Sequence, residues 1–368
     1  AAPLEEWQTE HLANWQTLYE QTYGQSDDRK DLGFNTVGWN SSYTAGPIPE
    51  EEMREWVEQT VEQIVSRQPR RVLEIGCGTG LLLSRIASSC REYWGTDYSE
   101  EALRVVRRLK QSRPDLEHVK LFQREAVDFA GIDEGAFDAV ILNSIVQYFP
   151  SIHYLLQVLE GAIRAVRPGG FIYVGDVRSL PLLKMYHVSV QLYQAPDSLT
   201  CLQLQQRVQQ RLAQEEELLL DPDLFAALGE RYPQIGNVEV RLQRGQSHNE
   251  LTRFRYQALL SLDSPVKHPI DWRSWRDAPW SVSQVRQFLL QSGPETLGLR
   301  GVANARLATE IKTLEWLQQG SEEATVGQLR AALSAGEPEG IDPEQFWELE
   351  TELPYEVQIG FSDDSTDG

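Results

Sequence analysis

Hydrophobic residues between positions 71 and 177 follow two patterns that alternate along the chain. Short apolar runs, typical of buried parallel strands, are separated by segments whose apolar residues recur every three or four positions, typical of helices. The runs predict strands at residues 71–75, 93–96, 119–123, 137–143 and 171–177. Because strands and helices alternate with short connections, the pattern predicts a doubly wound, mostly parallel α/β sheet.

Two further apolar runs follow a long helical stretch. Residues 180–235 are mostly helical and too long for a simple crossover, so they are expected to form an inserted helical lid. Residues 238–243 and 252–260 then predict two strands that pair as an antiparallel edge hairpin. With the first five strands they complete a Rossmann-like, seven-stranded sheet within a core of residues 69–261.

Helical patterns also flank this core on both sides. Residues 1–68 are expected to form an N-terminal helical lid, because two helical patterns are joined by a stretch rich in aromatic and turn-forming residues. Residues 262–368 are expected to form a C-terminal helical extension with one late strand at 355–361. The polar tail that starts at Ser362 is expected to be disordered.

Composition and charge limit the classes of partner. The chain has 34 Lys and Arg against 55 Asp and Glu, a net charge of −21, so binding to nucleic acid or to an anionic membrane surface is not expected. No apolar run approaches the ~20 residues of a membrane span, and residues 1–10 lack the features of a signal peptide. Cys77, Cys90 and Cys201 have no metal-site spacing and fit a reducing cytoplasm.

The strongest chemical signal follows the first predicted strand. The run from Glu74 to Gly80 reads E-I-G-C-G-T-G and leads into a helix. Glycines allow tight turns and a close approach to a ligand, and a helix N-terminus offers free N–H groups. Asp97 ends the second predicted strand, where doubly wound folds bind the hydroxyls of a nucleotide ribose. The combination predicts a nucleotide-like ligand at this edge of the sheet.

The spacing of the glycines separates two classes of ligand. Dinucleotide sites use G-x-G-x-x-G, with the pyrophosphate at the helix N-terminus, whereas this chain has G-x-G-x-G. The carboxyl group of Glu74, two residues before the first glycine, disfavours a pyrophosphate and suits a cationic or amino-acid ligand. A nicotinamide-dependent reductase is therefore the less favoured class.

This pattern resembles motif I of the class I S-adenosylmethionine-dependent methyltransferases. The resemblance implies that S-adenosylmethionine binds here and that S-adenosylhomocysteine leaves as product. No cluster of Cys, His and carboxylate residues has metal-site spacing, so a reaction without a metal ion is expected. Aromatic rings of the N-terminal lid are candidates to face the sulfonium. The residues expected to bind the cofactor are Glu74, Gly76, Gly78, Gly80, Asp97, Tyr98, Glu125, Ala126, Asn143 and Tyr43.

Longer stretches of sequence restrict the resemblance to a smaller group of methyltransferases. Residues 34–44, 47–57, 143–150, 175–183 and 249–256 are similar to the methyltransferase domains of modular polyketide synthases and nonribosomal peptide synthetases. The chain therefore looks like one excised domain of a megasynthase. The resemblance implies methyl transfer to an intermediate tethered by phosphopantetheine to an acyl or peptidyl carrier protein, and contact with other domains of the same synthase.

The acceptor atom is a hydroxyl oxygen or an amino nitrogen, since both subtypes share these strings. A hydroxyl needs a general base. His248 is the first candidate base, with Glu250 to orient it if this stretch is extended, and His187 is the second candidate. Because this pair is present and no adenylation sequence flanks the domain, an O-methyltransferase is expected. The alternatives are an N-methyltransferase of a peptide synthetase and a non-catalytic module that only binds the cofactor.

Overall fold

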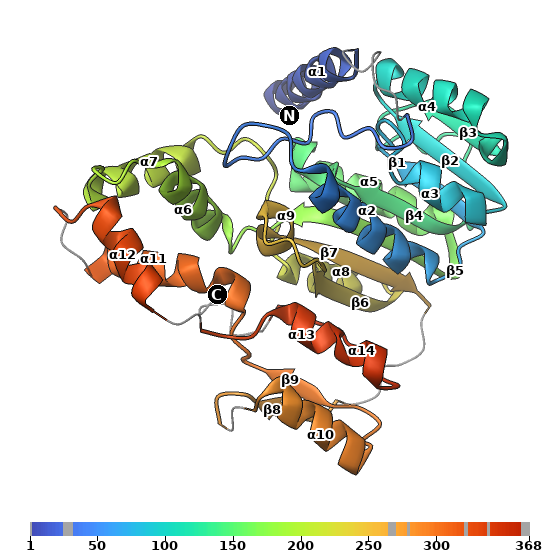
Figure 1. The fold of residues 1–368 in the computed structure, drawn as a ribbon. Coiled ribbons are helices and arrows are strands. Elements are labelled where there is room, and N and C mark those ends of the chain that lie inside the picture. The colour runs from blue at the N-terminus through green and yellow to red at the C-terminus, as the bar shows by residue number, and fades with distance from the viewer. Residues whose placement is uncertain are drawn as a thin grey trace.

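A seven-stranded sheet forms the centre of the computed structural model, in the order β3-β2-β1-β4-β5-β7-β6 (Figure 1). The structure describes residues 2–24, 32–263, 270–277, 280–319, 323–336 and 339–361. The strands of the sheet are β1 (Arg71–Ile75), β2 (Glu92–Asp97), β3 (Val119–Gln123), β4 (Phe137–Asn143), β5 (Val166–Arg178), β6 (Ile235–Leu242) and β7 (Arg255–Leu262). Pairing is parallel from β3 to β5, and β7 runs antiparallel to both β5 and β6. The expected Rossmann-like fold is confirmed.

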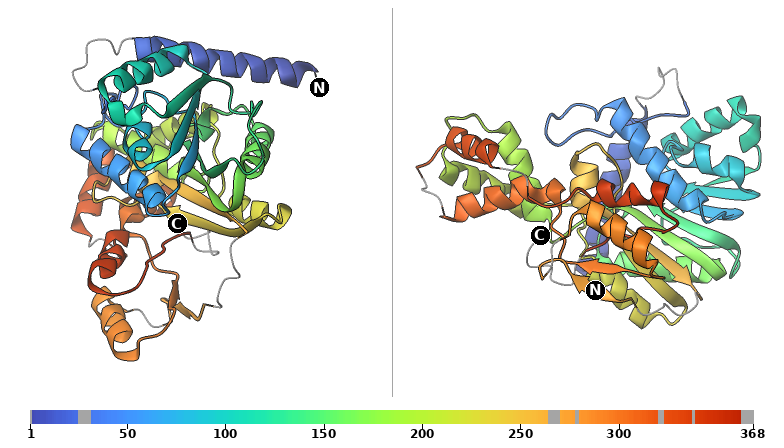
Figure 2. Two further views of the ribbon diagram at one scale, coloured as in Figure 1. Left: turned by 90° about the vertical axis from the view of Figure 1, so that its right-hand side faces the viewer. Right: turned by 60° about the horizontal axis from the view of Figure 1, so that its bottom comes forward.

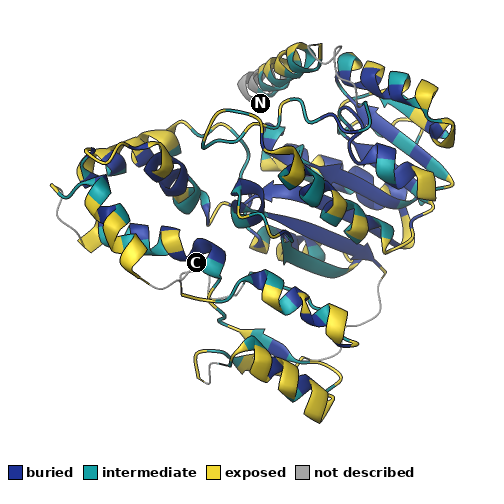
Figure 3. Ribbon diagram, viewed as in Figure 1, coloured by how far each residue is buried: buried dark blue, intermediate teal, exposed yellow. Residues whose placement is uncertain are grey.

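Alternating side chains of the central strands fill two hydrophobic cores, one on each face of the sheet. On β1, Val72 belongs to one core and Leu73 and Ile75 belong to the other. The first core is closed by α2 (Glu50–Val65), α3 (Leu83–Ile86) and α4 (Glu100–Ser112), and the second by α5 (Ile152–Ala165) and α8 (Asp223–Arg231). Figure 3 shows the buried strands between these helices, whose outward faces are exposed. Burial on both faces explains why the strands read as continuous apolar runs.

The N-terminal helix α1 (Ala2–Gly24) lies outside the sheet, beside α4 (Figure 2). The Gln16 side chain donates to the Tyr98 backbone oxygen over 3.2 Å, and the Glu100 amide donates to the Glu20 carboxylate over 3.0 Å. Both contacts fasten α1 near the residues that end β2 and begin α4. This position places one side of α1 over the carboxyl edge of the sheet.

The residues between β5 and β6 contain α6 (Leu183–Gln194) and α7 (Cys201–Ala213) as well as α8. Helices α6 and α7 project from the sheet and pack with α11 (Ala308–Gln319) and α12 (Val326–Ala335) from the C-terminal region (Figure 1). The expected helical insertion is present, but only α8 covers the sheet itself.

The C-terminal region differs from the expectation in its strands. Residues 355–361 form no strand, because the segment shares a backbone hydrogen bond with β6, from the Leu242 amide to the Ile359 oxygen at 2.9 Å, without a continuous ladder. A small parallel pair, β8 (Trp272–Ser274) and β9 (Gly298–Arg300), was not anticipated. It lies with α10 (Val282–Ser292), α13 (Pro343–Trp347) and α14 (Leu349–Glu352). The tail from residue 362 is outside the described residues.

One buried arginine attaches this region to the core. The Arg306 side chain, which is fully buried, donates to the backbone oxygens of Gln243 and Gly245 at 2.9 and 2.6 Å and pairs with Asp342 and Glu344. A short helix, α9 (Glu250–Phe254), precedes β7 and begins at Asn249, whose side chain accepts from the amides of Leu251 and Thr252. This helix delays the start of β7 relative to the expected strand at 252–260.

Among the helices that the structure describes, none has both the length and the apolar character needed to cross a bilayer.

Candidate active site

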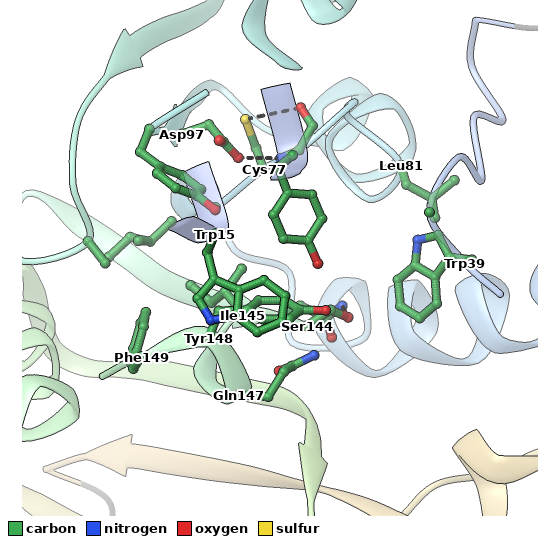
Figure 4. Close-up of a pocket in the computed structure, with 18 of the residues that line it drawn as sticks. Trp15, Trp39, Cys77, Leu81, Asp97, Ser144, Ile145, Gln147, Tyr148 and Phe149 are labelled. Carbon is green, nitrogen blue, oxygen red and sulfur yellow. Dashed lines mark hydrogen bonds between the residues drawn. The ribbon is translucent and has the colours of Figure 1, made fainter. Parts of the chain in front are cut away.

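A cavity of about 680 Å³ lies at the carboxyl edge of the sheet. Its floor is formed by the residues that end β1, β2 and β4, which is the place where doubly wound sheets bind ligands. Helix α1 and the loop before α2 cover it, and residues after β5, on α6 and at the start of β7 close its far end. Figure 4 shows Asp97 and Cys77 on one side of the cavity and Tyr148 and Gln147 on the other.

The glycine loop after β1 has a backbone that only glycine adopts easily. Gly76 and Gly78 have φ angles of +73° and +50°, in the left-handed region. A Cβ atom on Gly76 would lie 2.4 Å from the Ile145 side chain, and one on Gly78 would lie 3.5 Å from the Tyr23 hydroxyl. Gly78 thus leaves open the space between the loop and α1.

Asp97 binds the glycine loop directly. Its carboxylate accepts from the Gly78 amide and from the Ser99 amide, both at 2.8 Å. Burial raises the pKa of Asp97 to about 6, although these two backbone donors favour the charged form. Each oxygen has one backbone donor, so each keeps a lone pair for a ligand hydroxyl.

Glu74 is almost fully buried on β1 and also lines the cavity. Burial raises its pKa to about 8, in spite of a 2.7 Å hydrogen bond from the Tyr93 hydroxyl that favours the charged form. The carboxyl group therefore holds a proton at neutral pH until a cation comes near. A ligand ammonium group would supply that cation.

Aromatic rings form the roof. Trp15 and Tyr19 on α1 pack on Tyr148, with ring centroids 4.6 and 5.2 Å apart, and Tyr19 stacks on Tyr23 at 5.4 Å. All four line the cavity. Such faces suit the adenine ring and the sulfonium of S-adenosylmethionine.

The far end of the cavity is charged. Arg178 pairs with Glu217 at 2.8 Å, and Arg255 pairs at 2.6 Å with Asp176, which is fully buried. Glu250 also lines this end and accepts two hydrogen bonds from Ser42 at 2.9 Å. Among the described residues that line the cavity, none is a histidine.

Most of the residues expected to bind the cofactor lie together. Two of them do not line the cavity. Gly80 packs against α4, where a Cβ would lie 3.1 Å from Val106, and Tyr43 bonds through its hydroxyl to Ser189 at 3.0 Å. Those that line it are Glu74, Gly76, Gly78, Asp97, Tyr98, Glu125, Ala126 and Asn143.

The expected pairing of His248 with Glu250 is wrong. Asn249 caps α9, so Glu250 is already helical while His248 lies before the helix, and the two side chains bind different partners. His248 is half exposed and binds Asp342 at 2.6 Å, outside the cavity. Glu250 alone of this pair faces the site.

His187, the second expected base, is also outside the cavity lining. It is buried on α6, and its Nε2 lies 3.2 Å from the Glu215 carboxylate. Although burial alone would raise it, the pKa of Glu215 is lowered to about 2 by hydrogen bonds from His187 and Arg178. His187 thus belongs to a structural network behind the site.

Several cavity residues were not anticipated from the sequence. Ser42, Tyr186 and Arg178 come from three distant segments, so their meeting has no local signal. Trp15 and Tyr19 were visible only as the apolar side of a helix. Arg255 stands inside the 249–256 string, which was noted for its resemblance but not assigned a role.

Comparison with known proteins assigns the central part of the chain to a family. Residues 73–172, from β1 into β5, match the family model described as a methyltransferase domain. The solved N-methyltransferase NodS from Bradyrhizobium japonicum, in complex with S-adenosyl-L-homocysteine, is similar at 14% identity and a TM-score of 0.39, covering 61% of this chain and all of that one. The chain contains a methyltransferase domain.

Its curated relatives are much longer proteins. Chondramide synthase from Chondromyces crocatus is 44% identical over 367 residues, which are 98% of this chain and 9% of that protein. The nonribosomal peptide synthetase AsqK from Emericella nidulans is 29% identical over 96% of this chain and 14% of its own length. The beauvericin synthetase of Beauveria bassiana is 29% identical over 84% of this chain and 10% of its own length. The domain is of the type found in nonribosomal peptide synthetases, and it spans about a tenth of such chains.

Proposed function

We propose that this domain methylates the amino nitrogen of an aminoacyl or peptidyl group tethered by phosphopantetheine to a carrier protein of a nonribosomal peptide synthetase. The observation that carries the proposal is the chemistry of the far end of the cavity. Carboxylates line it at Glu217 and Glu250, whereas His248 and His187 stay outside. The sequence favoured an O-methyltransferase over an N-methyltransferase, and this proposal reverses that preference.

The hydroxyl and the amine acceptor have different chemical requirements. A hydroxyl is a poor nucleophile at neutral pH and needs a base, most often an imidazole. An amine is already a nucleophile once it is neutral, and it needs chiefly to be oriented. A carboxylate attracts an ammonium group and accepts a hydrogen bond from the neutral amine. The carboxylates of this cavity therefore suit a nitrogen acceptor.

The residues present fit S-adenosylmethionine at the other end. Gly78 leaves open the space that a side chain would enter, and Asp97 keeps lone pairs for the ribose hydroxyls. Glu74 offers a buried carboxyl group to an ammonium. When bound, S-adenosylmethionine supplies an electrophilic methyl group. The protein contributes alignment and keeps water away from the reacting atoms.

The proposal gives each of three parts of the chain a separate role. Residues 1–68 act as a cap over the cofactor, residues 69–261 as the methyltransferase core with the insertion at 180–235, and residues 262–368 as an extension. The carrier protein and the neighbouring domains of the synthetase are the proposed partners, in keeping with the small share of its relatives that the chain spans.

A direct assay tests the proposal. The protein is incubated with S-adenosylmethionine and either an aminoacyl-pantetheine or the matching hydroxyacyl-pantetheine, and the products are fragmented in a mass spectrometer. Methyl transfer to the amino substrate, with little transfer to the hydroxy substrate, is expected. Methylation of the hydroxyl alone would restore the O-methyltransferase alternative, and no methylation of either would favour a non-catalytic module.

A further inference from the structure

Three segments that are far apart in the sequence meet at Glu250. The Ser42 amide and hydroxyl, on the loop before α2, donate to the two carboxylate oxygens at 2.9 Å each. The Tyr186 hydroxyl, on the inserted helix α6, donates to the Ser42 hydroxyl oxygen at 2.6 Å. Glu250 itself begins α9 in the core. The result is a hydrogen-bond chain from Tyr186 through Ser42 to Glu250.

All three members of this chain line the cavity, and Glu250 is 4% exposed. A second contact holds the loop in place, because the Gln194 side chain, also on α6, donates to the Ser42 backbone oxygen at 2.9 Å. The other carboxylate at this end, Glu217, shares Arg178 with Glu215. The hydrogen-bond donors of Glu250 are neutral groups on Ser42 instead.

We propose that Ser42 and Tyr186 are positioning residues, which aim the Glu250 carboxylate so that it accepts the proton of the substrate amine. The proposal rests on the proposed function. The nitrogen–carbon bond forms as the carbon–sulfur bond breaks, with its electron pair left on sulfur. The surplus proton on nitrogen then passes to a Glu250 oxygen, which leaves a neutral methylated amine.

The surroundings of Glu250 agree with this role. Arg255, at the start of β7, faces it with a positive charge, and Tyr186 and Tyr43 are the titratable hydroxyls that face it from α6 and from the loop. Arg178 and Glu217 lie at the same end of the cavity as a mutual pair. Without the Ser42 hydroxyl, the Glu250 carboxylate would keep only the amide of the two donors on Ser42 and would lose its fixed orientation.

The test separates kcat from KM, with an aminoacyl-pantetheine substrate, for Ser42→Ala and Tyr186→Phe. Both variants are expected to lose about tenfold in kcat with KM kept within about twofold, because a misdirected carboxylate accepts the proton poorly while the substrate still binds. Affinity for S-adenosylhomocysteine is expected to stay unchanged, and Ser42→Thr, which keeps a hydroxyl, is expected to restore kcat.

Matched controls lie on the same segments. Thr44→Val removes an exposed hydroxyl of the loop, and Tyr193→Phe removes one from α6, where Tyr193 is 60% exposed. Both are expected to keep the wild-type kcat and KM. A loss in Ser42→Ala or Tyr186→Phe that falls on KM alone, or no loss, would overturn the proposal while wild-type N-methylation upheld the proposed function. A wild type that methylates only the hydroxyl substrate would overturn both.

Discussion

The Gly78 amide donates to the Asp97 carboxylate over 2.8 Å and thereby joins the glycine loop after β1 to the end of β2. The same carboxylate accepts from Ser99 at the start of α4. One buried acid therefore joins the glycine loop to the N-terminus of α4. This arrangement explains why a short glycine motif and a distant aspartate are informative together.

Substitution of Gly78 tests the loop. Gly78→Val is expected to weaken S-adenosylhomocysteine binding by at least about a hundredfold, because the side chain enters the cavity towards Tyr23 and the backbone is strained at φ +50°. Gly131→Val is the control, since Gly131 has a similar φ of +72° with nothing within 4 Å of a Cβ. Calorimetry measures both affinities. Unchanged affinity in Gly78→Val would remove the argument from the motif.

Binding of the cofactor is expected to release a proton near neutral pH. In the free protein the pKa of Glu74 is about 8, and a ligand ammonium beside it would lower that value. Affinity for S-adenosylhomocysteine should therefore fall as the pH drops from 8 to 6, and fall again below 6 as Asp97 takes up a proton. Calorimetry in buffers of different ionisation enthalpy counts the protons. Glu74→Gln should abolish the step between pH 6 and 8, and its persistence would assign that step to another group.

The same carboxyl group affects the stability of the free protein. Its pKa is higher in the folded than in the unfolded state, so its contribution to stability is complete below about pH 4.5 and is lost as the pH rises through 8. Glu74→Gln is expected to raise the melting temperature relative to wild type at pH 9, by a few degrees, but not at pH 5. The amide still accepts the hydrogen bond of Tyr93. A difference that does not change with pH would contradict this assignment.

Substitutions of His248 and of Glu250 are expected to have different effects on activity. His248→Ala is expected to keep turnover within about twofold, since its side chain binds Asp342 outside the cavity. Glu250→Gln should lose about a hundredfold in kcat/KM for the amino substrate, as expected for a lost proton acceptor, with cofactor affinity unchanged. Steady-state kinetics measure both. A large loss in His248→Ala with a normal Glu250→Gln would reinstate the histidine as base.

The sequence predicted the sheet and the glycine loop at its edge because their signals are local. Buried parallel strands leave continuous apolar runs, and Gly76 and Gly78 stand where the backbone turns with positive φ. The expected strand at 355–361 was wrong, because a strand also needs a neighbour with which it pairs along its length. Its residues have strand composition, but a continuous ladder with β6 does not form, and no local pattern reports that.

The acceptor end could not be predicted, because its geometry comes from tertiary packing. His248 and Glu250 are two residues apart, yet the cap at Asn249 separates their side chains. Ser42 and Tyr186 are 144 residues apart and meet within 2.6 Å. The expected assignment of the base therefore failed where the fold, and not the neighbourhood in sequence, decides which groups meet. The domain boundaries and the cytoplasmic location stay predictions.

The central claim is that the glycine loop, Glu74 and Asp97 hold S-adenosylmethionine or its product. A crystal structure of the protein grown with S-adenosylhomocysteine measures this directly. The expected result is the nucleoside against Gly76 and Gly78, its ribose hydroxyls on Asp97 and its ammonium group near Glu74, beneath Trp15 and Tyr148. Density for the compound at another place, or a cavity without it at saturating concentration, would contradict the claim.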